Sequence, residues 1–213
     1  MKKTFMAILL CLPLMANAQN EWEEMEHETT PQQETTKAKK VVVTEDQKYL
    51  AGAVPVVDGH VVFTTTIKAP GKSAAQIYGI IKGYMEKMTK MKNQSEQSRI
   101  AIDDPQKGNI CGVYQEWLVF KSTALVLDRT RFFYNLIADV KDGEAVITMN
   151  RIYYLYDEER NPQTMKAEEW ITDEYGLKKN KEKLSRVSGK FRKKTIDRKD
   201  YIFKKLTELL NDR

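Results

Sequence analysis

Pro70-Gly71-Lys72-Ser73 is the stretch of this sequence that comes nearest to a nucleotide-binding motif. A phosphate-binding loop has a further glycine, four residues before its Gly-Lys-Ser triplet, so that the backbone can wrap around the phosphates. Thr66 occupies that position here. The tetrapeptide therefore predicts a chain reversal and a helix that begins at Ser73, and we expect no nucleotide at this place.

The two histidines are too few for metal or triad chemistry. His27 lies in an acidic stretch, and His60 opens a predicted strand. Zinc sites gather three or four protein ligands, and a Ser-His-Asp triad would have to use His60 without a nucleophile motif near it. We expect neither a metal nor a cofactor.

A hydrolase is the least favoured alternative, and it is suggested only by pairs of adjacent carboxylates. Asp103-Asp104 and Glu168-Glu169 are such pairs, and glycosidases work with two carboxylates in a cleft. Acidic side chains are mostly exposed and solvated, however. We expect a protein that is not an enzyme, and a compact cleft with two buried carboxyls would favour the hydrolase.

The N-terminus has the form of a secretory signal peptide. Met1-Lys2-Lys3 precedes an apolar run, and Ala16-Asn17-Ala18 matches a cleavage site. Residues 1–18 are thus predicted to be removed on export to the periplasm or the extracellular space. No later stretch is long and apolar enough to cross a bilayer.

Removal of this segment leaves Cys111 as the sole cysteine. An exported chain with one cysteine has no internal disulfide, so its core must be stable without one. Because no histidine lies near it in sequence, we expect Cys111 to be a packed thiol rather than a nucleophile.

Charge is distributed unevenly along the chain, although the net charge is only +5. Residues 19–40 are polar and rich in glutamate, which predicts a flexible spacer. Residues 178–199 are strongly basic. The candidate patch for an anionic surface or partner comprises Lys190, Arg192, Lys193 and Lys194. An ordinary solvated surface and pairing with the acidic spacer of the same or another molecule are the alternatives.

The region from Gly112 to Asp157 is dense in β-branched and aromatic residues and predicts three consecutive strands. Asp142-Gly143 favours a two-residue hairpin turn, from which the strand register can be counted outwards. The predicted core face carries Phe132, Tyr134, Leu136, Ala138, Ile147, Met149, Arg151 and Tyr153. The opposite face carries Arg131, Phe133, Asn135, Ile137, Thr148, Asn150, Ile152 and Tyr154, which together form the candidate binding face.

Other segments supply further strands and helices. Strands are predicted at 60–67 and 99–103. A helix with a capping box at Ser73 is expected to run to Lys92, a short one to cover 167–175, and a last one to begin near Thr195. The result is one α+β domain over residues 41–213. Its single antiparallel sheet has β-α-β-β-β-β-α order, with helices packed on one face.

Four stretches resemble a family of exported bacterial domains of unknown function with a TATA-binding-protein-like (TBP-like) fold. They are 115–120, 122–130, 168–173 and 188–197. The resemblance implies the same β-α-β-β-β-β-α sheet and no activity. It does not imply DNA binding, because function does not follow from a fold.

The sequence favours a non-catalytic binding module whose partner is a protein, glycan or lipid of the cell envelope. Nucleic acid is not expected, because exported proteins seldom meet it. A small-molecule or lipid carrier, with the ligand between helices and sheet, is the alternative. A large apolar cavity lined by Ile81, Met85 and Phe203 would favour the carrier.

Overall fold

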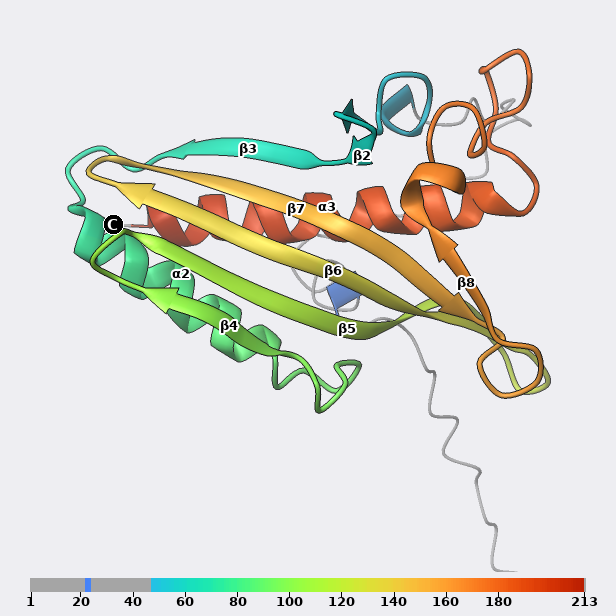
Figure 1. The fold of residues 1–213 in the computed structure, drawn as a ribbon, viewed down its shortest axis with the longest axis horizontal. Coiled ribbons are helices and arrows are strands. Elements are labelled where there is room, and N and C mark those ends of the chain that lie inside the picture. The colour runs from blue at the N-terminus through green and yellow to red at the C-terminus, as the bar shows by residue number, and fades with distance from the viewer. Residues whose placement is uncertain (1–21, 24–46, 213) are drawn as a thin grey trace, which may run out of the picture.

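A computed structural model describes residues 22–23 and 47–212 (Figure 1). The predicted signal peptide 1–18 lies outside these residues, as does the predicted spacer 19–40 except for Trp22 and Glu23. Among the described residues, no helix is long and apolar enough to cross a membrane.

A six-stranded antiparallel sheet forms the framework, in the order β3-β7-β6-β5-β4 with β8 also paired to β7. Its strands are β3 (Phe63–Lys68), β4 (Arg99–Asp104), β5 (Asn109–Ser122), β6 (Leu127–Lys141), β7 (Glu144–Tyr156) and β8 (Gln163–Lys166). The helices α2 (Ala74–Met88) and α3 (Ser188–Asn211) lie behind the sheet in Figure 1. The short elements are η1 (Gln47–Tyr49), β1 (Val56–Val57), β2 (His60–Val61) and η2 (Ala167–Glu169). The predicted β-α-β-β-β-β-α order is confirmed, with β8 inserted before α3.

The start of α2 follows from the capping box predicted at Ser73. The Ser73 hydroxyl accepts the backbone N–H of Gln76, and the Gln76 side chain accepts the backbone N–H of Ser73. The helix ends at Met88, earlier than the predicted Lys92. The chain turns there because Asn93 and Gln94 donate hydrogen bonds to Glu116 of β5.

The C-terminal region differs from the prediction in two places. Residues 167–175 form only the short η2 followed by turns, and Tyr175 is exposed instead of packing on the sheet. The helix α3 begins at Ser188, well before the predicted Thr195. Its first turn packs tightly, since a Cβ on Gly189 would lie 2.8 Å from the Leu184 Cβ.

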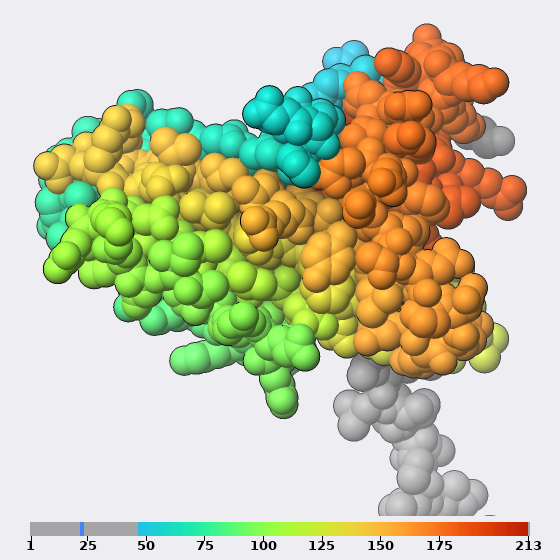
Figure 2. Space-filling view, viewed as in Figure 1, coloured from blue at the N-terminus to red at the C-terminus, as the bar shows by residue number. Residues whose placement is uncertain are grey.

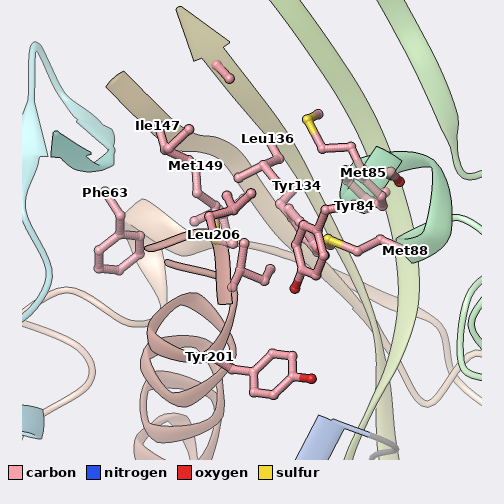
Figure 3. Packing of buried hydrophobic residues seen from close by; sticks show 14 of the residues in the cluster. Phe63, Tyr84, Met85, Met88, Tyr134, Leu136, Ile147, Met149, Tyr201 and Leu206 are labelled. Atoms are coloured by element: carbon pink, nitrogen blue, oxygen red, sulfur yellow. Dashed lines mark hydrogen bonds between the residues drawn. The ribbon is translucent and has the colours of Figure 1, made fainter. Parts of the chain in front are cut away.

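The core fills the space between the sheet and the two helices (Figure 3). In that view Leu136 and Tyr134 of β6 lie beside Met85 and Met88 of α2. Aromatic rings hold the centre of the buried sheet face, with Tyr134 stacked on Tyr114 at a centroid distance of 5.2 Å.

A buried ion pair crosses this core from the middle of β5 to α3. Arg198 donates from Nε to Oε1 of Glu116 at 2.7 Å and from Nη2 to Oε2 at 2.9 Å, and both side chains are wholly buried. Asn93 and Gln94 donate to the same carboxylate. The charge of Glu116 is therefore matched on several sides, as burial of a carboxylate requires.

The hairpin joining β6 and β7 has the predicted register near its turn, where Ala138 faces Ile147 and Leu136 faces Met149. Beyond Asn135 and Asn150 the register shifts by one residue. The extra residue is Arg151, whose φ of 52° lies in the left-handed region. This is a β-bulge, and it turns the following side chains to the opposite face.

The bulge overturns the predicted faces of four β7 residues. Ile152 and Tyr154, expected on the binding face, are buried in the core. Arg151 and Tyr153, expected in the core, are exposed. Phe132 and Phe133 accordingly pair with Tyr154 and Tyr153, one position further along β7 than predicted.

Substitution of Arg151 tests the bulge. Glycine adopts a positive φ without steric cost, so Arg151→Gly should leave the free energy of unfolding unchanged or raise it by up to about 1 kcal/mol. Arg151→Val should lower it by roughly 1–2 kcal/mol, because a β-branched residue is strained at this φ. Urea unfolding measures both. Thr148→Gly, in regular strand, is the control and should be destabilising; an equal loss in Arg151→Gly would contradict the bulge.

The ion pair is tested by removing one charge and then both. Arg198→Met leaves the Glu116 carboxylate buried without its cation, and should lower the free energy of unfolding by about 3–5 kcal/mol. Glu116→Gln combined with Arg198→Met removes both charges and keeps an acceptor for Asn93 and Gln94. The double variant should recover at least half of the loss in denaturant unfolding. If it is no more stable than Arg198→Met, the loss does not come from the unpaired charge.

Candidate binding site

The face of the sheet that points away from α2 and α3 is uncovered along its central strands (Figure 2). We call its side chains on β5, β6 and β7 the open face; they are Trp117, Arg131, Phe133, Asn135, Ile137, Thr148, Asn150 and Tyr153. Six of the eight predicted binding-face residues lie here, and all six are half-buried. The other two, Ile152 and Tyr154, belong to the core, and Tyr153 lies on the open face instead.

Trp117 is the centre of one group on the open face. The guanidinium carbon of Arg129 lies 3.7 Å from its ring centroid and that of Arg131 lies 3.8 Å from it. Arg131 is the direct cross-strand partner of Trp117, so the register of β5 and β6 produces the contact. Guanidinium groups stacked on an aromatic ring keep hydrogen-bond donors at their edges.

Phe133 and Tyr153 form a second group beside the first. Their rings stack with centroids 4.2 Å apart and planes inclined by only 6°. Tyr153 is 38% exposed, which makes it one of the more exposed aromatic residues of the described chain. Aromatic pairs across neighbouring strands stabilise a sheet, and here the pair also presents a flat apolar surface to solvent.

A hollow of about 310 Å³ adjoins the Trp117 group. It is lined by Trp117, Leu127, Arg129 and the loop from Asp157 to Arg160. The loop carboxylates meet the arginines, with Glu159 at 3.4 Å from Arg129 and Glu158 at 3.5 Å from Arg131. Both signs of charge therefore border the aromatic surface, which suits a polar partner better than an acyl chain.

Sequence reasoning did not identify Trp117, Arg129 or Tyr153 as site residues. Trp117 and Arg129 could have been found by counting the register of β5 against β6. The register of this pair could not be counted from the sequence, because the turn after Ser122 lacks a two-residue hairpin signature. The register also shifts near Lys121. Tyr153 was assigned to the wrong face because of the bulge.

The four residues of the predicted anionic patch do not form one exposed surface. Arg192 is fully buried and donates to the backbone carbonyls of Tyr49 and Ile171, each at 2.7 Å, and to Asp173. Lys190 pairs with Asp128 at 2.6 Å. The expectation is wrong for Arg192, since a side chain without exposure meets no external anion.

The other two lysines of that patch are also engaged within the protein. Lys193 pairs with Asp197 at 2.7 Å and donates to the Tyr49 hydroxyl. Lys194 pairs with Glu23, at the edge of the predicted acidic spacer. These basic side chains attach η1, the start of β6 at Asp128 and Glu23 to α3.

Three of the four acidic residues considered for hydrolysis make structural contacts. Asp103 accepts a hydrogen bond from Tyr78 at 2.6 Å, and Asp104 pairs with Lys107. Glu168 accepts the backbone N–H of Val61 at 2.8 Å. Within residues 22–23 and 47–212, Glu116 is the one buried carboxyl, and no cluster of three His, Cys, Asp or Glu side chains could hold a metal ion.

Cys111 is buried on the sheet, in agreement with the expected packed thiol. Burial raises the pKa of this thiol, and the more distant positive charge of Arg151 offsets only part of that effect. A raised pKa keeps the sulfur protonated and weakly nucleophilic.

None of the hollows described in residues 22–23 and 47–212 is lined by Ile81, Met85 or Phe203, the residues named for a carrier. Ile81 and Met85 are fully buried in the packed core, and Phe203 is half-buried. A groove of about 560 Å³ lies elsewhere, between α2 and α3, and includes Ile80, Tyr84, Met91, Tyr201 and Leu209 in its lining.

The Asp197 carboxylate provides a test that depends on pH. Burial would raise its pKa, but hydrogen bonds from Lys193, Tyr49 and Lys48 outweigh this and hold the pKa below its ordinary value. A lowered folded-state pKa stabilises the protein above the unfolded pKa, and this stability is lost as the pH falls through the folded pKa.

Asp197→Asn should therefore lower the free energy of unfolding by about 1–2 kcal/mol at pH 7. The difference from the parent protein should shrink as the pH falls from about 4, the ordinary pKa of aspartate in the unfolded chain, through the lower pKa of the folded state. Urea unfolding between pH 2 and pH 7 measures it. Glu96→Gln, an exposed control, should change little at either pH; a pH-independent loss in Asp197→Asn would contradict the electrostatic explanation.

Comparison with known proteins agrees with this architecture. A family model described as a domain of unknown function (DUF4468) with TBP-like fold matches residues 63–155. The crystal structure of a DUF4468 family protein from Bacteroides ovatus is 42% identical, with a TM-score of 0.73 over 79% of this chain and 96% of that one. A TBP-like protein from Parabacteroides distasonis is 18% identical with a TM-score of 0.57 over 74% of this chain and 96% of that one, which shows the fold alone.

No curated protein matches the chain. The predicted α+β, TBP-like fold is confirmed, and so is the predicted resemblance to a family of unknown function with that fold. From its match to the Bacteroides ovatus protein, the chain belongs to the DUF4468 family.

Proposed function

We propose that this protein is an exported, non-catalytic binding module that holds its partner on the open face. The observation that carries the proposal is the array of two stacked groups on the open face, Trp117 with its arginines and Phe133 with Tyr153. Aromatic residues and arginine are the types most enriched in the energetically important parts of protein interfaces.

The shape and chemistry of the open face favour a protein or glycan partner over a lipid. Flat aromatic rings offer stacking surface, while Asn135, Thr148 and Asn150 supply hydrogen-bonding groups beyond the Phe133–Tyr153 pair, on the side away from Trp117. The hollow beside Trp117 adds charges of both signs. A partner with alternating apolar and polar groups would use all three features.

Export is supported by the pattern of residues 1–18, a basic start followed by an apolar run and an A-x-A site. The partner would then be a component of the cell envelope or its surroundings. A non-catalytic role is supported by the chemistry of the described residues, in which Asp103, Asp104 and Glu168 are engaged in structural contacts.

Site-specific photocrosslinking in the native cells tests the open face. A photoreactive phenylalanine analogue at position 133 or 153 keeps an aromatic ring in place and should give a discrete crosslinked species. Glu86, exposed on α2 behind the sheet, is the matched control position and should give none. Trp117→Ala should reduce the yield at position 133 at least threefold.

Two results would refute the proposal. One is the absence of adducts at both open-face positions while the protein is stably present. The other is an equal pattern of adducts from position 86. Treatment of the adduct with a protease or with glycosidases then separates a protein partner from a glycan.

A further inference from the structure

Trp22 is a side chain from outside the domain that is nevertheless one of its most buried residues, with 1% of its surface exposed. Its ring centroid lies 5.8 Å from that of Tyr201 on α3. The Arg198 guanidinium lies 5.7 Å from the same ring. Figure 3 shows the short ribbon of residues 22–23, in blue, beside Tyr201.

The indole sits over the buried ion pair of Glu116 and Arg198. A cation beside an aromatic face is attracted to it, and more strongly where water is excluded. Nε1 of Trp22 has no hydrogen-bond acceptor within the described part of the chain. The ring itself, rather than the indole N–H, is therefore what this site recognises.

The next residue adds a charge contact. The Glu23 carboxylate pairs with Lys194, one turn before Arg198 on α3, and about a fifth of the Lys194 side chain is exposed. Lys194 also lies 5.9 Å from the Trp22 ring. The site thus combines an aromatic surface and two cations, which fits an aromatic residue followed by an acidic one.

Trp22 and Glu23 are far from the domain in sequence, so their contact with α3 can be treated as an intramolecular binding equilibrium. Residues 24–46 separate Glu23 from η1, and a chain of this length can span roughly 75 Å when extended. The contacts with Tyr201 and Arg198 of α3 hold Trp22 at this place. Tethering also gives the segment an effective concentration on the order of millimolar at its site.

We propose that Tyr201, Arg198 and Lys194 of α3 form a peptide-binding site for an aromatic residue followed by an acidic residue, occupied by Trp22-Glu23 of the same chain. This inference is independent of the proposed function, because α3 lies on the opposite side of the sheet from the open face. Docking holds Trp22 and Glu23 on the helical side of the sheet, opposite the open face.

A labelled peptide of residues 19–28 tests the site on the chain from Gln19 to Arg213. Trp22→Ala empties the site and should bind the peptide at least tenfold more tightly than the parent chain, in which the tethered segment competes. A peptide with Ala at position 22 should not bind, and one with Phe should bind within tenfold of the parent peptide. Fluorescence anisotropy measures the affinities, and circular dichroism checks that Trp22→Ala keeps its fold.

The ion pair of Glu23 with Lys194 is tested by reversing its two charges while the peptide keeps its tryptophan. Glu23→Lys in the peptide should weaken binding to Trp22→Ala at least threefold, and Lys194→Glu in that chain should restore it. Equal binding to the parent and Trp22→Ala chains, or no binding to either, would overturn the proposal. A dimer of the parent chain that Trp22→Ala dissociates would show instead that a second copy supplies the segment.

Discussion

The burial of Glu116 is the constraint on which the rest of the structure depends. A carboxylate in the middle of a sheet, on its core face, is tolerated only with a matched cation and further donors. Arg198 supplies both nitrogens of a bidentate contact, and Asn93 and Gln94 complete the set. This requirement fixes the position of α3 along the sheet and ends α2 where the chain turns towards β5. Burial of an apolar helix face alone would not fix the position of the helix along the sheet so closely.

Both helices cover the sheet face that carries Glu116, so the other face of the central strands stays uncovered. A single bulged residue then determines which β7 side chains lie on that uncovered face. Arg151 takes the extra position, so Tyr154 enters the core, where its hydroxyl shares a 2.7 Å hydrogen bond with that of Thr195. Tyr153 turns outward and stacks on Phe133. In a regular strand, Tyr153 would point into the core and Tyr154 outward. The bulge therefore determines both the packing of the core and the aromatic surface of the open face.

Local signals in the sequence predicted much of this fold, and distant contacts account for what it missed. The capping box at Ser73 and the Asp-Gly turn involve neighbouring residues, so the first helix and the β6–β7 hairpin could be located with their register. The bulge has no such signature, because arginine is not a residue that favours positive φ. The sequence did not show that α3 begins before Arg192. The residues that bind this buried arginine, such as Tyr49 and Asp173, are distant from it in sequence. Trp22 lies in an acidic stretch without periodicity, and nothing local indicates that it is buried.

The basic segment shows why charge along a sequence is a weak guide to a binding surface. Lys190, Arg192 and Lys194 pair with Asp128, Asp173 and Glu23 from other parts of the chain, and Lys193 pairs with Asp197 on the same helix. The charge of these four side chains is therefore compensated within the protein. On the open face, the arginines near Trp117 likewise face Glu158 and Glu159. With net charge balanced at both places, a partner would be selected by stacking and hydrogen bonds of defined geometry, and binding at the open face should depend less on salt than a polycationic patch would.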